Sequence, residues 1–200
     1  MWTSWYKTIG RANYAIAFAE LEGGSNSERL IAEAKFLRAY TYFFLVRSFG
    51  DVPIQGEIEF VDGEPVVDPS VDLSTRNPKA DVYEYIKADL NDAIAVLPAK
   101  SEYADKDLGR ATRGAAQAML AKVNLYQENW QEALDNANAV INSGEYGLEQ
   151  NYENIWRESS ENGTESIFEI QARGKAIAHG VQQYSQTQGA TGPSGWGLVV

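Results

Sequence analysis

Several aromatic residues lie in segments of the sequence that lack helical periodicity. The chain contains 5 tryptophans and 11 tyrosines. A flat aromatic ring can contact the apolar face of a sugar, while amide and guanidinium groups can hydrogen-bond its hydroxyls. An alternative role for two of the tryptophans, Trp156 and Trp196, is to cover the ends of a helical stack. The candidate ligand-binding residues are four aromatic residues with three polar neighbours: Tyr103, Trp156, Tyr184, Trp196, Arg173, Gln183 and Gln188.

Residue types suited to catalysis or metal binding are scarce. His179 is the only histidine, and the chain has no cysteine. A histidine-rich metal site, a thiolate metal site and a catalytic triad are therefore excluded. Asp89 and Asp92 have the spacing of residues on a helix surface, and we interpret them as solvated charges rather than an acid–base pair. We predict that the protein is not an enzyme and uses no metal or cofactor.

The composition limits the compartments and partners of the chain. Its 200 residues are 44% hydrophobic, which is enough to bury the core of one domain spanning residues 1–200. A net charge of -11 opposes contact with nucleic acid, because the phosphates would be repelled. No stretch approaches the roughly 20 apolar residues of a membrane-spanning helix. The amino end shows no signal peptide, so the chain is either cytosolic or a fragment whose export signal lies upstream.

Apolar residues recur every three or four positions in five segments, which predicts five helices. Ser25 with Glu28 has the pattern of a capping box, and Thr112 is expected to cap the fourth helix. The second helix is apolar over most of its circumference and must be surrounded by other elements. The predicted helices run from Thr3 to Leu21, from Ser25 to Phe49, from Pro78 to Leu97, from Thr112 onward, and from Asn129 to a stop at Gly144.

Two regions of the chain depart from the helical pattern. The segment from Asp51 to Pro78 contains four prolines and reads as a long connection, of a kind that usually has a function or docks onto something. Beyond Gly144 the chain is richer in polar residues, and the alternating run from Ser166 to Gln171 predicts one strand. We therefore expect a helical-repeat core at 1–144 and a loop-rich region with a short strand at 145–200, truncated at its end.

The last two predicted helices match the tetratricopeptide template, in which small residues stand where two helices cross closely. Ala121, Ala133 and Ala137 occupy such positions. Trp130 is expected in the core, and Asn124 stands where an aromatic residue is usual. The second and third helices give another copy of the repeat, with the long connection inserted between them and with Tyr40 and Tyr42 in the core. The predicted fold is all-α with minor β: tetratricopeptide-like helical repeats with long loop insertions.

Blocks of sequence in a fixed order resemble the SusD/RagB family of outer-membrane nutrient-binding lipoproteins. The most characteristic block is a helix that ends in the turn Phe49-Gly50-Asp51-Val52-Pro53-Ile54. The resemblance extends over nearly the whole chain. Several similar blocks in the same order identify a family more specifically than a single block would. The other similar blocks are residues 32–46, 82–90, 109–116, 121–126, 166–170 and 195–197.

The resemblance implies a function at the surface of Bacteroidetes-type bacteria. A SusD-like protein would bind an oligosaccharide, peptide or other nutrient without catalysis, at the extracellular face of the outer membrane. It would deliver that nutrient to a TonB-dependent, SusC-like transporter. Family members carry an amino-terminal lipidated cysteine and continue past the point where this chain stops, so we interpret the chain as a fragment of such a protein.

A cytosolic tetratricopeptide adaptor is the alternative interpretation from a different functional class. Such a protein would hold a partner peptide in the concave face of its repeats. An export signal and a lipidation cysteine encoded upstream would separate the two interpretations, because a cytosolic adaptor needs neither.

Overall fold

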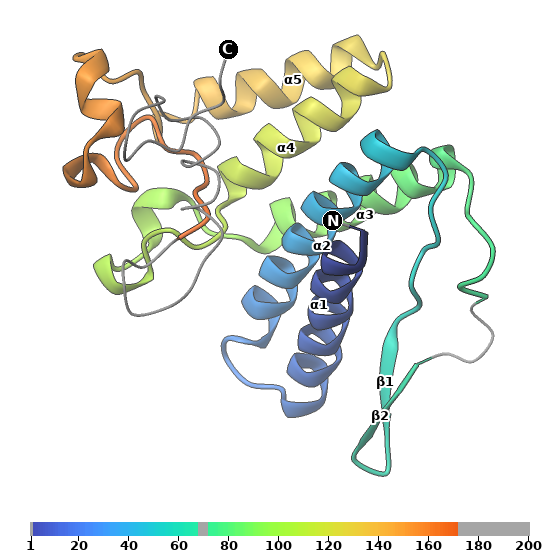
Figure 1. Ribbon diagram of the computed structural model, residues 1–200. Helices are drawn as coiled ribbons and strands as arrows, with labels where there is room; N and C mark the ends of the chain where they lie inside the picture. The colour runs from blue at the N-terminus through green and yellow to red at the C-terminus, as the bar shows by residue number, and fades with distance from the viewer. Residues whose placement is uncertain (1, 68–71, 172–200) are drawn as a thin grey trace, which may run out of the picture. The chain divides into compact units, whose positions relative to one another are not determined.

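The computed structural model describes residues 2–67 and 72–171, which contain five α-helices and one β-hairpin (Figure 1). All five predicted helices are confirmed. Contacts divide the chain into Met1–Phe168 and Glu169–Val200, and the description below concerns the first unit. The expected division of the chain near residue 144 stays a prediction. The elements are α1 (Trp2–Glu22), α2 (Ser27–Phe49), β1 (Ile58–Val61), β2 (Glu64–Val67), α3 (Lys79–Val96), α4 (Arg113–Tyr126) and α5 (Trp130–Ile141), with short 3-10 helices at Lys100–Glu102, Asp105–Asp107, Tyr152–Trp156 and Glu158–Ser160.

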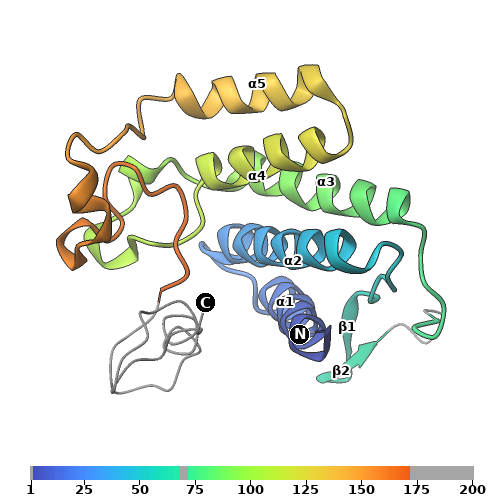
Figure 2. The same cartoon turned by 45° about the horizontal axis from the view of Figure 1, so that its top comes forward.

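Helices that follow one another in the chain pack side by side, from α1 through α5 (Figure 2). Helix α2 lies between α1 and α3, and its side chains Phe36, Tyr42 and Leu45 are almost fully buried. This confirms that the apolar circumference of α2 is surrounded. Leu30 and Leu37 of the same helix are nevertheless each 42% exposed. No described helix combines the length and the apolar character that crossing a lipid bilayer requires.

The helix starts follow the sequence signals only in part. Thr112 caps α4 as predicted, because its Oγ1 accepts the amide of Ala115 at 3.0 Å. The capping box predicted at Ser25 and Glu28 is wrong: Asn26 occupies the cap position of α2 and makes no side-chain cap hydrogen bond. The tight turn between α1 and α2 shifts the helix start one residue past the predicted cap.

Helices α4 and α5 form the predicted repeat. Ala133 is buried, and Ala121 and Ala137 are half-buried between the two helices. The prediction that Trp130 lies in the core is wrong, because its side chain is 62% exposed and lines an open apolar groove between α4 and α5. Asn124 is buried, and its side-chain oxygen accepts a hydrogen bond from the Asn129 amide at 3.2 Å. A polar contact between these two side chains thus closes the turn between α4 and α5, at a position where the tetratricopeptide template has an aromatic residue.

The connection between α2 and α3 contains a β-hairpin that the sequence analysis missed. Strands β1 and β2 are antiparallel and are joined by Asp62 and Gly63, both with positive φ. An Asp-Gly pair between short apolar runs is a known hairpin signal. The hairpin packs on α1 through Phe60, whose ring contacts Tyr14 and Phe18 edge-on.

The strand predicted at residues 166–171 is not formed. These residues make no strand ladder in the structure. Ile167 and Phe168 pack on the helical core instead, and the ring of Phe168 meets Phe36 edge-on with 4.9 Å between centroids, whereas Ile170 is 72% exposed. The Lys100 ammonium group donates a hydrogen bond to the carbonyl oxygen of Ser166 at 2.9 Å. The residues that dock are two neighbours in sequence, so the alternating pattern corresponds neither to a strand nor to the buried side of this segment.

Asp89 is buried in an ion pair, contrary to the prediction of a solvated surface carboxylate. The Arg38 guanidinium donates to both Asp89 oxygens, at 2.8 and 2.7 Å, and also to the Asn13 side chain at 2.8 Å. Asn13 in turn donates to the carbonyl oxygen of Gly56 at 2.8 Å. Burial raises the pKa of Asp89, while its hydrogen bonds with Arg38 act in the opposite direction. This network joins α1, α2, α3 and the connection that follows α2.

Candidate functional site

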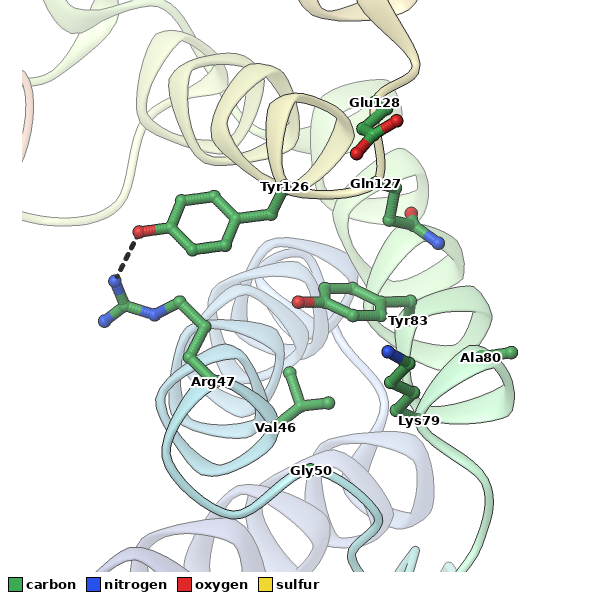
Figure 3. Close-up of a pocket in the computed structure, with 9 residues that line it drawn as sticks. All are labelled: Val46, Arg47, Gly50, Lys79, Ala80, Tyr83, Tyr126, Gln127 and Glu128. Atoms are coloured by element: carbon green, nitrogen blue, oxygen red, sulfur yellow. Dashed lines mark hydrogen bonds between the residues drawn. The ribbon is translucent and has the colours of Figure 1, made fainter.

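A cleft of about 540 Å³ lies where the ends of α2 and α4 meet the start of α3 (Figure 3). Aromatic, basic, amide and acidic side chains share it, which distinguishes it from the almost purely apolar groove between α4 and α5. The cleft is lined by Val46, Arg47, Gly50, Lys79, Ala80, Tyr83, Tyr126, Gln127 and Glu128.

The chain itself holds the two helix ends together at the cleft. Gly50 ends α2 with a φ of 70°, a conformation that favours glycine, and its amide donates to the Val46 carbonyl at 2.9 Å. The next residue, Asp51, accepts the Lys79 backbone amide on its carboxylate at 2.8 Å. The end of α2 is therefore tied to the first residue of α3, although Asp51 and Lys79 are 28 positions apart in the sequence.

Two tyrosines provide the aromatic surfaces of the cleft. Tyr126 is half-exposed, and its ring rests edge-on against Phe43 with 5.2 Å between centroids. Tyr83 is partly buried against the core, and burial raises the pKa of its hydroxyl while Arg47 lowers it. Figure 3 shows both rings bordering the space between the helix ends. Both phenol hydroxyls can donate or accept hydrogen bonds.

Arg47 is held among aromatic rings and has no acidic partner among the described residues. Its guanidinium lies 4.6 Å from the ring centroid of Phe43, 4.8 Å from that of Phe44 and 5.4 Å from that of Tyr126. One of its amino groups donates to the Tyr126 hydroxyl at 3.2 Å. Stacking fixes the plane of the guanidinium and leaves most of its N–H donors for other partners.

The remaining polar groups lie at the other side of the cleft. Gln127 follows the last residue of α4, and its side-chain oxygen is buried without a hydrogen-bond partner in the described part of the chain. Glu128 has a positive φ of 62° at the turn into α5. Lys79 is exposed at the start of α3, and Figure 3 shows it across Tyr83 from Arg47. The cleft can therefore offer both donors and acceptors to a polar ligand next to two aromatic rings.

Of the predicted site residues, Tyr103 is the one whose side chain the structure describes. Its hydroxyl donates to the Ala111 carbonyl at 2.8 Å and lies 3.4 Å from a carboxylate oxygen of Glu33, and burial raises its pKa to about 12. It does not line the cleft. Trp156 ends the 3-10 helix Tyr152–Trp156, and its side chain lies outside the described residues. The other predicted site residues also lie outside them: Arg173, Gln183, Tyr184, Gln188 and Trp196.

Sequence reasoning missed the residues of the cleft because they belong to helices. Tyr83, Tyr126 and Arg47 fall within regular helical periodicity, which indicates a core or a solvent-facing role and not a site. A usable signal was the pair of helix boundaries at Gly50 and Pro78, because a long insertion between two packed helices must return the chain to nearly the same place.

Known proteins share the fold and much of the sequence. Residues 1–125 match the SusD-like family described as "Starch-binding associating with outer membrane". The SusD-like protein P2 of Formosa agariphila is 35% identical over 191 residues, which cover 91% of this chain and 35% of that protein. The chain thus spans about a third of the length of this relative.

Solved structures agree with the sequence comparison. The crystal structure of a SusD-like protein from Bacteroides fragilis matches with a TM-score of 0.71 and 27% identity, over 86% of this chain and 33% of that one. A laminarin-binding SusD-like protein matches with a TM-score of 0.70 and 32% identity, over 84% of this chain and 36% of that one. The helical array described above is therefore an arrangement found in larger proteins of this kind.

Proposed function

The chain belongs to the SusD-like family of starch-binding proteins that associate with the outer membrane, and from this premise we propose that it binds a glycan at the bacterial cell surface without catalysis. The family supports nutrient capture over the cytosolic peptide adaptor. The relative described as laminarin-binding supports a glycan as the nutrient. Laminarin binding is a property of that protein and is not transferred to this chain.

The observation that carries the proposal is the combination of groups in the cleft. Tyr83 and Tyr126 offer aromatic faces, and Gln127 brings a buried amide oxygen that has no partner within the described residues. Sugars need this pairing, because one face of a pyranose ring is apolar while its hydroxyls require donors and acceptors.

The chemistry of the cleft supports binding rather than hydrolysis. Glycoside hydrolases generally use two carboxyl groups on either side of the scissile bond. Among the described residues that line the cleft, Glu128 is the one carboxylate. No group of three or more metal-binding side chains occurs in the described ranges either.

We further propose that the bound glycan is passed to a TonB-dependent, SusC-like transporter in the outer membrane. This partner follows from the family resemblance. In this view the packed helices hold the cleft in a fixed shape for the glycan, while the long connection between α2 and α3 meets the transporter.

A matched pair of variants tests the glycan site. Calorimetric titration of the protein with a panel of oligosaccharides, starting with laminarin fragments, should identify a ligand. Tyr126→Ala should then weaken binding about tenfold, or about 1.4 kcal/mol. Tyr14→Ala, which removes a similarly exposed tyrosine from α1, should leave affinity unchanged. Absence of binding across the whole panel, or equal effects of the two variants on affinity, would contradict the proposal.

A further inference from the structure

Two basic side chains, Arg47 and Lys79, line the cleft. The protein has a formal net charge of -11, yet two cationic side chains line this cleft with one carboxylate, Glu128. Neither Arg47 nor Lys79 forms an ion pair within the described ranges. More deeply buried cations of the described part do have acidic partners, as with Arg38 and Asp89 or Arg110 and Glu33.

Two acidic groups near the cleft, Asp51 and Glu84, have partners of their own. The Asp51 carboxylate accepts the Lys79 backbone amide. Glu84, one residue beyond Tyr83, forms an ion pair with Lys87. Neither carboxylate forms an ion pair with Arg47 or Lys79 in the described ranges.

We propose that the cleft selects anionic sugars, bearing a uronic-acid carboxylate or a sulfate ester, through Arg47 and Lys79. This inference rests on the proposed glycan-binding function and specifies its ligand class. The stacked guanidinium of Arg47 is held in a fixed plane, as bidentate recognition of a carboxylate or sulfate requires. The ammonium group of Lys79 acts as a mobile charge on the opposite side of Tyr83 (Figure 3).

The geometry gives each part of an acidic oligosaccharide a partner. The ring faces of Tyr83 and Tyr126 contact the apolar side of a sugar unit, and Gln127 serves its hydroxyls. The acidic substituent is bound by Arg47 or Lys79, in an overall field that repels anions elsewhere on the chain. A neutral sugar of the same backbone makes the first two kinds of contact but leaves both cations unpaired.

Matched pairs of oligosaccharides test the inference by calorimetry on the whole chain. One pair is an oligogalacturonide and its fully methyl-esterified form, which share a backbone and differ in charge. The other pair is a sulfated oligosaccharide and its desulfated form. At least one charged member should bind about tenfold more tightly than its neutral counterpart, and the pair that shows the difference identifies carboxylate or sulfate as the group recognised.

Charge-removing variants locate the preference. Lys79→Gln changes an exposed side chain at the start of α3, and Arg47→Gln changes the stacked one. Each should reduce the ratio between charged and neutral binding at least threefold, whereas Arg11→Gln, an equal charge change on the exposed face of α1, should not. Thermal unfolding of each variant checks that the fold is retained, and Lys79→Gln gives an independent answer if Arg47→Gln unfolds early.

The outcomes separate this inference from the proposed function. Neutral members that bind as tightly as charged ones would overturn the anionic preference and leave glycan binding in place. A preference for charged sugars that both cleft variants retain would also overturn the inference, because another site would then recognise the charge. If none of these four oligosaccharides binds, and no member of the neutral panel binds, the glycan-binding function itself is overturned.

Discussion

At the scale of single residues, the structure gives different roles to residues that look alike in sequence. Asp89 and Asp92 stand three positions apart on α3. Asp89 is buried against Arg38, whereas Asp92 is mostly exposed and meets Lys35 at 2.7 Å. Both carboxylates face α2, but only Asp89 meets a buried arginine there. The spacing of residues along α3 could not separate the two, because this difference depends on the side chains of α2.

This difference predicts unequal effects of removing the two charges. Asp89→Asn should lower the free energy of unfolding by about 3 kcal/mol, because it leaves the buried Arg38 charge without its partner. Asp92→Asn should change it by less than about 1 kcal/mol, since exposed ion pairs contribute little. Urea denaturation followed by circular dichroism measures both. Losses of equal size would show that the Arg38–Asp89 pair does not hold the helices together.

At the scale of elements, the regular helices could be predicted and their exceptions could not. Five amphipathic or buried segments were recognisable because a period of three to four residues persists over many turns. The hairpin at β1 and β2 and the false strand at 166–171 are both short, so local alternation was a weak signal for each. Trp130 was misplaced because its burial depends on what covers α5, which the spacing within one repeat does not determine.

The start of α4 depends on the close approach of the Tyr146 ring to Gly114. A Cβ added to Gly114, near the start of α4, would lie 2.5 Å from the ring of Tyr146, whose hydroxyl is hydrogen-bonded to Thr112. Gly114→Ala should therefore lower the free energy of unfolding by about 2 kcal/mol, since the tyrosine must move and lose that bond. Thermal and urea unfolding provide the measurement.

Gly10 in α1 is the matched control for this substitution. A Cβ there would meet Gln55 at 3.6 Å, an ordinary contact, so Gly10→Ala should stabilise the protein by about 0.5–1 kcal/mol through helix propensity. Combining Gly114→Ala with Tyr146→Ala should cost less than the two single changes added together. Additive losses would mean that Gly114 is needed for another reason than space for the Tyr146 ring.

At the scale of the whole molecule, the family and the fold class were predictable from ordered blocks of sequence, and the comparisons confirm both. The residues of the proposed cleft were not predicted, and the site residues chosen from sequence stay a prediction. Sequence reasoning selected aromatic residues in irregular segments, and most of them lie outside the described residues. The cleft arises from helix ends that come together only on folding: Arg47 from α2, Tyr83 from α3 and Tyr126 from α4.

The central claim is that a glycan binds in this cleft, and nuclear magnetic resonance of the 22.1 kDa chain tests it most directly. During titration with an oligosaccharide that calorimetry shows to bind, the largest amide shift changes should cluster at Arg47, Lys79 and Gln127. Changes confined to the surroundings of Tyr103, or to residues 172–200, would place the site among the residues chosen from sequence and contradict the assignment to the cleft.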